Sequence, residues 1–170
     1  ETYYPESLSE VAELKCPFPA VVKPAVMWKF FQKTGRKAFL ARTKNELISL
    51  YTSACSVVNP NELIVQEVIP NVTDQLYSFC TFYKQNKTMA RVVIRRSRHH
   101  PMEFGHCSTY VEQTECPEIE LLGQKILNQI NYYGICEVEF VRDPRDDTFK
   151  FLEINPRIWG QISLAQSAGI

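Results

Sequence analysis

The sequence predicts an α+β fold made of two units that meet near Pro70. Each half of the chain mixes short apolar runs, which are typical of strands, with amphipathic stretches of helical period. The run that ends at Ile69 is followed by Pro70-Asn71, a pair that favours a turn. No internal repeat is visible. A chain of 170 residues can bury roughly two thirds of its unfolded surface, which is enough for two small units.

The first unit, residues 1–69, begins with a predicted helix from Ser7 to Leu14, because serine can cap the N-terminus and apolar residues recur at helical spacing. Pro24 ends the first strand, since proline cannot donate to a ladder. The aromatic and basic stretch that follows is expected to be a loop with a turn at Gly35. Apolar runs predict strands at 18–24, 37–41 and 63–69, and helical spacing predicts a helix at 44–53.

The second unit, residues 70–170, is expected to open with a hairpin whose turn spans Lys84 to Lys87. A basic loop and an irregular segment with Pro101 and Gly105 are expected next. One apolar face predicts a helix at 118–131, which Gly134 ends. Strands are predicted at 75–83, 88–94, 135–141 and 148–154, with a turn at 143–147 joining the last two.

The composition excludes several classes of function. Nineteen basic and nineteen acidic residues cancel, so no overall field attracts nucleic acid or an anionic membrane. No apolar run reaches the ~18 residues needed to span a bilayer. The six cysteines form no CxxC pair, which argues against structural zinc, and we expect reduced thiols in the cytoplasm. The chain starts without Met and ends in an apolar helical pattern, so we interpret it as an excised fragment with a truncated C-terminal end.

Four polar side chains are expected on one face of the last hairpin. Glu137 and Glu139 alternate along its first strand, and Glu153 and Asn155 along its second. Carboxylates with an amide oxygen suit Mg²⁺, whose octahedral shell is completed by phosphate and water. Arg157 follows directly and can bind a phosphate or acyl oxygen with two hydrogen bonds. The alternative is a hairpin whose acidic face is merely solvated.

On these residues the sequence resembles the ATP-grasp superfamily, and within it the carboxylate–amine ligases similar to the large subunit of carbamoyl phosphate synthase. Three motifs occur in the family's order, at 18–24, at 64–70 and at 134–140 with Leu152–Arg157. The resemblance implies an ATP-grasp fold, in which two α+β subdomains bind ATP between them. Residues 1–69 would form the small lobe, with the phosphate-lysine strands and a covering loop, and 70–170 the large lobe with the metal-binding hairpin.

The resemblance also implies roles for single residues. Mg²⁺, with Mn²⁺ as the alternative ion, would be held against the phosphates of ATP by two carboxylates and an amide. Arg157 resembles the catalytic arginine that steadies the transferring phosphoryl group. The implied metal ligands are Glu139, Glu153 and Asn155; the implied ATP contacts are the phosphate lysines Lys23 and Lys37, the adenine segment Glu67, Val68 and Ile69, and the ribose acid Asp74.

The sequence departs from the family in two ways. A bulky stretch, residues 25–33, stands where many members have a glycine-rich loop that covers the phosphates. Either Lys29 and Lys33 replace the amides of that loop, or the loop closes only when an acceptor is present. The upstream α/β domain of the family is absent from these residues, so we expect it elsewhere in the parent chain, and the fragment alone is expected to bind ATP poorly or not turn over.

A basic cluster has two interpretations that stay open. It would meet the γ-phosphate or an acidic substrate, or it is a solvated face. Its members are Arg91, Arg95, Arg96, Arg98, His99 and His100.

The function that the resemblance implies is an ATP- and Mg²⁺-dependent ligase, which activates a carboxylate as an acyl-phosphate for attack by an amine. No side-chain nucleophile is needed, in keeping with the lack of a Ser-His or Cys-His arrangement. Small-molecule carboxylates and amines are the implied substrates, although their identity lies beyond the sequence. The alternatives are an ATP-binding module without chemistry and a phosphotransferase on the same fold.

Overall fold

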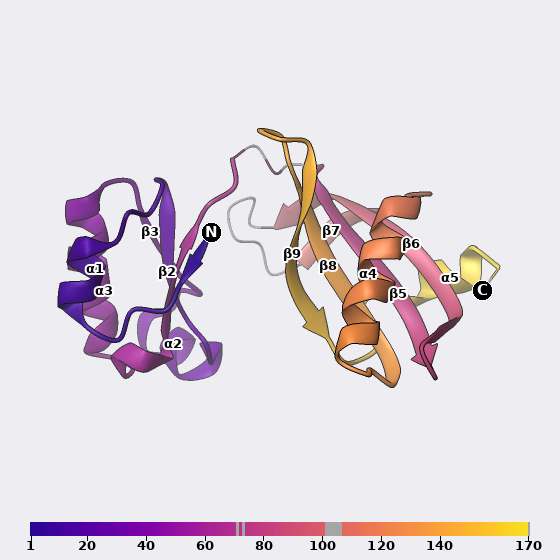
Figure 1. Cartoon of the computed structure of the whole chain (residues 1–170), viewed down its shortest axis with the longest axis horizontal. Coiled ribbons are helices and arrows are strands. Elements are labelled where there is room, and N and C mark those ends of the chain that lie inside the picture. The colour runs from indigo at the N-terminus through magenta and orange to yellow at the C-terminus, as the bar shows by residue number, and fades with distance from the viewer. Residues whose placement is uncertain (71, 73, 101–106, 170) are drawn as a thin grey trace. The chain divides into compact units, whose positions relative to one another are not determined.

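The computed structural model describes the chain except residues 71, 73, 101–106 and 170, and except the side chains of residues 99, 100, 107 and 108. Two compact units result, Glu1–Ile69 and Pro70–Ile170 (Figure 1). Each unit packs helices on its own antiparallel sheet. None of the helices in the described ranges is long and apolar enough to cross a membrane.

The first unit has a four-stranded sheet in the order β1-β4-β2-β3. Helices α1 and α3 lie on one side of this sheet (Figure 1), where Tyr51 and Leu47 are fully buried against Val22 and Val65. The elements are β1 (Thr2–Tyr3), α1 (Leu8–Glu13), β2 (Ala20–Pro24), α2 (Met27–Thr34), β3 (Phe39–Ala41), α3 (Lys44–Cys55), the 3₁₀ turn η1 (Pro60–Glu62) and β4 (Leu63–Glu67).

The predicted helices of this unit are confirmed, and side-chain caps explain where they start. Ser7 Oγ accepts a hydrogen bond from the N–H of Glu10 at 3.3 Å, and Thr43 Oγ1 accepts one from the N–H of Glu46 at 3.2 Å. Such caps satisfy N–H groups that have no partner inside the helix. The carboxylate of Glu46 in turn accepts from the N–H of Arg42 at 2.7 Å, so the cap is reciprocal.

The prediction of a loop at 25–33 is wrong, because most of this stretch forms α2. Phe30 is fully buried and its ring meets Phe39 edge to face, with centroids 5.0 Å apart. Gly35 ends the helix in the left-handed region, at φ +66°, which glycine adopts without strain. Met27, Phe30 and Phe31 recur at helical spacing, but the stretch is short and rich in lysine, so this period was not recognised.

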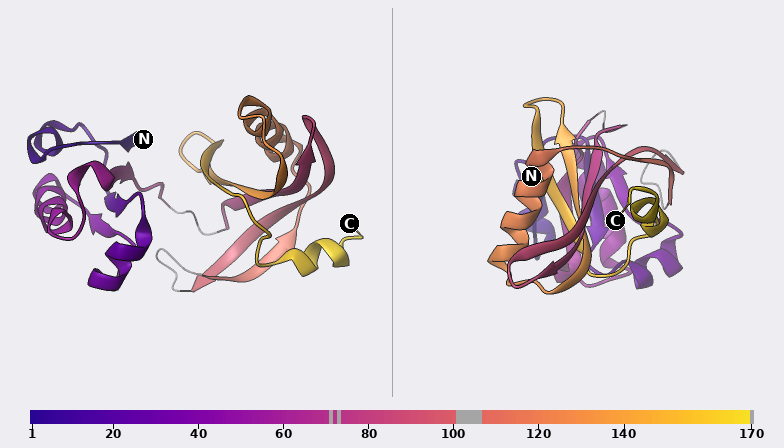
Figure 2. Two further views of the ribbon diagram at one scale, coloured as in Figure 1. Left: turned by 90° about the horizontal axis from the view of Figure 1, so that it is seen from below. Right: turned by 90° about the vertical axis from the view of Figure 1, so that its right-hand side faces the viewer.

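The second unit has a five-stranded sheet in the order β7-β6-β5-β8-β9, with every neighbouring pair antiparallel. Figure 2 shows α4 on one face of this sheet and α5 on the other. The elements are β5 (Leu76–Lys84), β6 (Lys87–His100), β7 (Cys107–Gln113), α4 (Pro117–Gln129), β8 (Gly134–Asp143), β9 (Thr148–Asn155) and α5 (Ile162–Ser167).

The two faces of this sheet carry different side chains, since successive residues of a strand point to opposite faces. The face toward α4 holds the larger core, in which Phe79, Val138 and Phe140 pack against Ile119 and Leu127. The opposite face has a smaller apolar cluster and, beside it, the polar residues described below. That cluster consists of Cys80, Val92, Ile94, Trp159 and Ala165.

The hairpin predicted at 75–94 is confirmed, and its turn places Gln85 and Asn86 at φ +52° and +58°. The segment after Ile94 corrects an expectation. It is no basic loop, because β6 continues to His100, and β7 then runs from Cys107 to Gln113 where an irregular segment was expected. Because arginines lie on both faces of β6, its sequence does not alternate between apolar and polar residues, and the strand was not recognised there. Pro101 and Gly105 lie outside the described residues.

Strand ends in the first unit also differ from the prediction. β3 starts at Phe39, so Lys37 lies in a bend before the strand. β4 ends at Glu67, although the N–H of Val68 still donates to the carbonyl of Pro19 at 2.9 Å.

Thiols are unpaired at the five described cysteines, Cys16, Cys55, Cys80, Cys116 and Cys136.

Gly123 of α4 marks the closest approach of a helix to the sheet. A Cβ atom added there would lie 2.4 Å from Cδ1 of Phe79, a fully buried ring. We expect Gly123→Ala to destabilise the protein by about 1–3 kcal/mol, because overpacking outweighs the better helix propensity of alanine. Urea unfolding measures this change. Gly160→Ala is the control, since nothing lies within 4 Å of its added Cβ; equal stability of the two variants would contradict the close packing.

Asp143 is the buried anchor of the turn between β8 and β9. Its carboxylate accepts hydrogen bonds from Arg145 Nε at 2.9 Å and Nη2 at 2.6 Å, and these bonds lower its pKa from 3.8 to about 2. The interaction therefore stabilises the fold above pH 3.8, and the stabilisation is lost as the pH falls toward about 2.

We expect Asp143→Asn to lower the free energy of unfolding by about 1 kcal/mol at neutral pH, because Arg145 is half exposed and the charged bond is partly screened. The difference from wild type should shrink below pH 3.8. Chemical denaturation at several pH values measures it, with Glu115→Gln, which neutralises an exposed carboxylate of the same unit, as the control. A difference that is independent of pH would refute the role of the Asp143 charge.

Candidate functional site

The predicted face of carboxylates is formed by β8 and β9. In their antiparallel register Glu139 lies opposite Glu153, and Glu137 lies opposite Asn155. Directly opposed residues point to the same side of a sheet, so all four side chains share one face. It is the face opposite α4, because Val138 and Phe140, between and beside these glutamates, belong to the core under α4.

Asn155 links the two glutamates of β8. Its Nδ2 donates to Oε1 of Glu139 at 2.8 Å and to Oε2 of Glu137 at 3.3 Å. Glu137 is only 4% exposed, and burial, followed by the nearby charge of Glu139, raises the pKa of its carboxyl group, while Arg96 opposes that shift. Two acidic groups are thus held close together at the inner end of this face.

Arg96 and Ser78 belong to the same site. The sequence placed Arg96 only in the basic cluster, whose role stayed open, and gave Ser78 no role. Ser78 of β5 lies opposite Glu139 and is fully buried. Arg96 of β6 reaches over β5, where its Nη2 lies 2.5 Å from Oε2 of Glu139 and 3.1 Å from Oγ of Ser78. Alternation could have placed Arg96 on the face of Ile94, but the pairing of β5 with β8 was needed to bring it to Glu139.

The outer part of the site is exposed. Glu153 is exposed and has no hydrogen bond or ion pair among the described residues. Arg157 is also exposed, and its Nη2 donates to Oδ1 of Asn155 at 3.4 Å, while its Nη1 donates to the carbonyl of Ile158 at 3.2 Å. The structure therefore brings Glu139, Glu153, Asn155 and Arg157 together.

The basic cluster is divided between the two faces of β6. Arg91 pairs with Glu120 of α4 at 2.6 Å, and Arg95 donates from Nε to the carbonyl of Asp74 at 2.9 Å. Arg96 alone of the described arginines of the cluster contacts the carboxylates of β8. The side chains of His99 and His100 lie outside the described residues.

The donor atoms of the site fit Mg²⁺, which binds carboxylate and amide oxygens. Glu139 and Glu153 offer such oxygens from adjacent strands, and Asn155 offers Oδ1 once its amide turns over, since Nδ2 now faces the glutamates. Within the described ranges, no three His, Cys, Asp or Glu side chains gather closely enough to hold a metal. Protein side chains thus supply part of a shell, and phosphate and water have to supply the rest.

The expected ATP contacts of the first unit lie on its sheet and the segments beside it. Lys23 is half-buried on β2 and lies opposite Ile64, and Lys37 lies in the bend before β3. Glu67 ends β4, where Oε2 lies 2.7 Å from the α-amino group of Glu1, and Val68 and Ile69 follow it. Lys23 and Glu67 thus lie on one sheet, and the other three residues lie in the segments beside it.

Asp74 lies at the start of the second unit. It adopts φ +64°, in the left-handed region that aspartate tolerates better than most residues. Its carbonyl accepts the hydrogen bond from Arg95 described above. The backbone of Asp74 is thereby fixed beside β6. Binding of ribose by its carboxylate stays a prediction from the resemblance.

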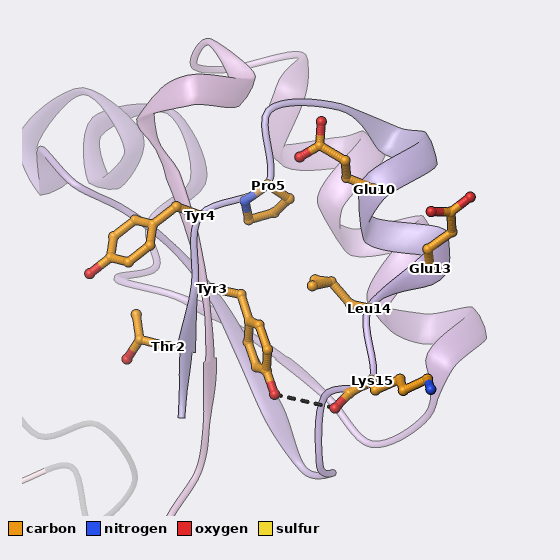
Figure 3. Close-up of a pocket in the computed structure, with 8 residues that line it drawn as sticks. All are labelled: Thr2, Tyr3, Tyr4, Pro5, Glu10, Glu13, Leu14 and Lys15. Atoms are coloured by element: carbon orange, nitrogen blue, oxygen red, sulfur yellow. Dashed lines mark hydrogen bonds between the residues drawn. The ribbon is translucent and has the colours of Figure 1, made fainter.

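A hollow of about 430 Å³ lies elsewhere, beside β1 and α1 of the first unit (Figure 3). Tyr3 crosses it and donates from its hydroxyl to the carbonyl of Lys15 at 3.2 Å. None of the residues predicted to bind ATP or metal lines it. The lining consists of residues 2–5 with Glu10, Glu13, Leu14 and Lys15.

Comparison with known proteins gives one family and several relatives. Residues 5–169 match the family model described as "Carbamoyl-phosphate synthase L chain, ATP binding domain". The chain is 23% identical to the carbamoyl phosphate synthase large chain of Methanothermobacter thermautotrophicus, over 96% of this chain and 15% of that relative. The chain therefore spans only a small part of the length of this relative.

Two solved structures share the fold. One is a biotin carboxylase from Campylobacter jejuni in complex with β-γ-ATP, with a TM-score of 0.71, 17% identity, and coverage of 91% of this chain and 35% of that one. The other is the biotin carboxylase domain of 2-oxoglutarate carboxylase from Hydrogenobacter thermophilus, in complex with MgADP, ADP and bicarbonate. Its TM-score is 0.66 at 16% identity, with coverage of 95% of this chain and 36% of that one.

These biotin carboxylase domains have the ATP-grasp fold, so the predicted fold class is confirmed. The family match extends over almost the whole chain and includes both sheets and the hairpin of β8 and β9. The chain belongs to the family of the carbamoyl-phosphate synthase L chain, ATP binding domain.

Proposed function

We propose that this chain is the ATP-binding part of an ATP- and Mg²⁺-dependent ligase, which activates a small carboxylate as an acyl-phosphate for attack by an amine. The observation that carries the proposal is the register of β8 and β9, in which Glu139 faces Glu153 and Glu137 faces Asn155. Carboxylates that would hold Mg²⁺, next to an arginine, suit phosphoryl transfer, because the ion and the guanidinium would neutralise the negative charge of the phosphates. The family match supports binding of ATP.

In this proposal Glu139, Glu153 and Asn155 would hold Mg²⁺. The ion would neutralise charge on the phosphates as the γ-phosphoryl group moves to the substrate carboxylate. The complex of a solved relative with MgADP supports the choice of ion. Arg157, which is exposed and anchored only through Asn155 and a backbone carbonyl, would bind the moving phosphoryl group with its free N–H groups.

The first unit would supply the remaining contacts with ATP, as the smaller lobe. Lys23 and Lys37 would bind phosphates, Glu67 with the backbone of Val68 and Ile69 would read the adenine edge, and Asp74 of the second unit would bind the ribose. Helix α2 occupies the stretch where many members of the superfamily have a glycine-rich loop. Lys29 and Lys33 of that helix then remain as the cations that would replace backbone amides.

The rest of the reaction would depend on parts outside this chain. The chain spans 15% of the matched carbamoyl phosphate synthase, so the pocket for the carboxylate and amine is proposed to lie largely on other domains of the parent protein. After the acyl-phosphate forms, the amine would attack its carbonyl carbon and release phosphate. No nucleophilic side chain of this chain takes part in either step.

Glu153 allows a clean test of the metal site, because it is exposed and has no described partner whose loss would disturb the fold. We expect Glu153→Gln in the complete protein to lower substrate-dependent ADP release at least ~100-fold, since one metal ligand loses its charge. The free energy of unfolding should change by less than about 0.5 kcal/mol. ADP release is measured with pooled amino acids and small carboxylates.

Glu115→Gln serves as the matched control, because it neutralises an exposed carboxylate of the same unit between β7 and α4. It should leave ADP release unchanged. If Glu153→Gln also leaves it unchanged, the proposed ligase is wrong. If calorimetry shows Mg·ATP binding by the wild type but no ADP forms with any pool, the chain is an ATP-binding module without chemistry.

Lys23 provides a separate test of the phosphate contacts on the first unit. We expect Lys23→Met to weaken ATP binding about 10- to 100-fold, since a charge-assisted hydrogen bond to phosphate contributes about 1.5–3 kcal/mol. Calorimetry with Mg·ATP gives the dissociation constant. Lys125→Met is the control for loss of a lysine charge, since Lys125 is an exposed residue of α4. Equal affinity of both variants would remove Lys23 from the site.

A further inference from the structure

Arg96 is the one basic side chain that the described contacts place against the inner carboxylates, and no role follows for it from the proposed function. It lies on β6, two strands away from β8, and reaches Oε2 of Glu139 across β5 at 2.5 Å. Both side chains are only 13% exposed. An ion pair that is so little hydrated is far less screened than one at the surface.

The charges around Arg96 show what it does there. Glu137 and Glu139 lie two residues apart on the same strand face, and both accept hydrogen bonds from Nδ2 of Asn155. Asn155 is neutral, so it satisfies lone pairs but leaves the charge uncompensated. Arg96 supplies the positive charge, with its Nη2 at 2.5 Å from Oε2 of Glu139. Oε2 of Glu139 is therefore already in use by the guanidinium.

The guanidinium of Arg96 is itself only partly satisfied. Its Nη2 donates to Oγ of Ser78 at 3.1 Å in addition to the ion pair. Its Nε is buried and has no hydrogen-bond partner among the described residues. Buried donors are normally paired, so a free Nε–H is a place where an anionic oxygen would be bound favourably.

We propose that Arg96 is an internal counter-ion of Glu139, which a divalent cation has to displace, so that the cation and a phosphate anion bind together. The cation takes the carboxylate oxygen of Glu139, and the displaced guanidinium takes an oxygen of the anion. Arg96 is then a positioning residue that makes the empty site a poor binder of the ion alone. This inference rests on the proposed metal site, and it adds an order of binding to it.

The test measures Mn²⁺ binding to the complete protein without nucleotide, by electron paramagnetic resonance of the free ion. We expect Arg96→Gln to bind Mn²⁺ at least about tenfold more tightly than the wild type, because the competing charge is gone. Arg96→Lys keeps a charge at this position and should retain most of the weak wild-type binding. Arg91→Gln, on the opposite face of β6, is the control for general loss of an arginine charge.

With Mn·ATP the order of the two affinities should reverse, so that the wild type binds more tightly than Arg96→Gln. Because ATP itself chelates Mn²⁺, this arm is measured by calorimetric titration of the protein with preformed Mn·ATP. Arg96→Gln is expected to bind Mn·ATP less tightly than the wild type, since no guanidinium is left to receive the phosphate. Equal Mn²⁺ affinity of Arg96→Gln and wild type without nucleotide overturns the inference. It does so even if Glu153→Gln abolishes ADP release, in which case the proposed ligase stands.

Loss of Arg96 also leaves two carboxylates close together, so Arg96→Gln has to be checked for folding. Thermal unfolding with and without Mn²⁺ serves this purpose. If the ion raises the melting temperature of Arg96→Gln more than that of the wild type, the ion replaces the arginine and the inference is supported. If the ion has no larger effect, while Arg96→Gln/Glu139→Gln regains wild-type stability, the arginine only balances charge within the fold and the inference is refuted.

Discussion

Burial of two carboxylates on one sheet face is the constraint on which the site depends. Glu137 and Glu139 point away from the core under α4, yet Glu137 is almost completely buried. Removing one partner of a buried ion pair costs about 3–5 kcal/mol, far more than a surface pair contributes, so these groups need fixed partners. Asn155 provides hydrogen bonds from the neighbouring strand and Arg96 provides charge from two strands away. The order and register of the strands therefore determine which side chains form the site.

The α4 face of the same sheet holds this arrangement in place. A shift of β8 by one residue would turn its glutamates toward the apolar core and expose Val138 and Phe140, so burial on one face fixes the register on the other. Gly123 contributes, because it lets α4 approach Phe79 closely. The core of the second unit thus determines which side chains meet across β8 and β9.

Alternation along a strand explains why the hairpin of the site was predictable from sequence, whereas Arg96 was not. Glu137, Glu139, Glu153 and Asn155 lie on two strands joined by a short turn, so local period and one turn place them together. Arg96 reaches Glu139 only because β5 pairs with both β6 and β8, which local spacing does not reveal. Helix α2 was missed for a different reason, since its helical period is present in the sequence but spans only eight residues.

The inner and outer halves of the site differ in how firmly the fold holds them. Glu137 is buried, and Glu139 and Arg96 are only 13% exposed and paired with each other, so folding itself sets their positions. Glu153 and Arg157 are exposed and weakly tied, which leaves them able to move toward a ligand. In the proposed reaction, an ordered inner half would lower the cost of arranging charge at the moment of phosphoryl transfer. The same order has a consequence for binding: a cation alone meets a carboxylate that is already paired, whereas a cation with phosphate brings a new partner for the arginine.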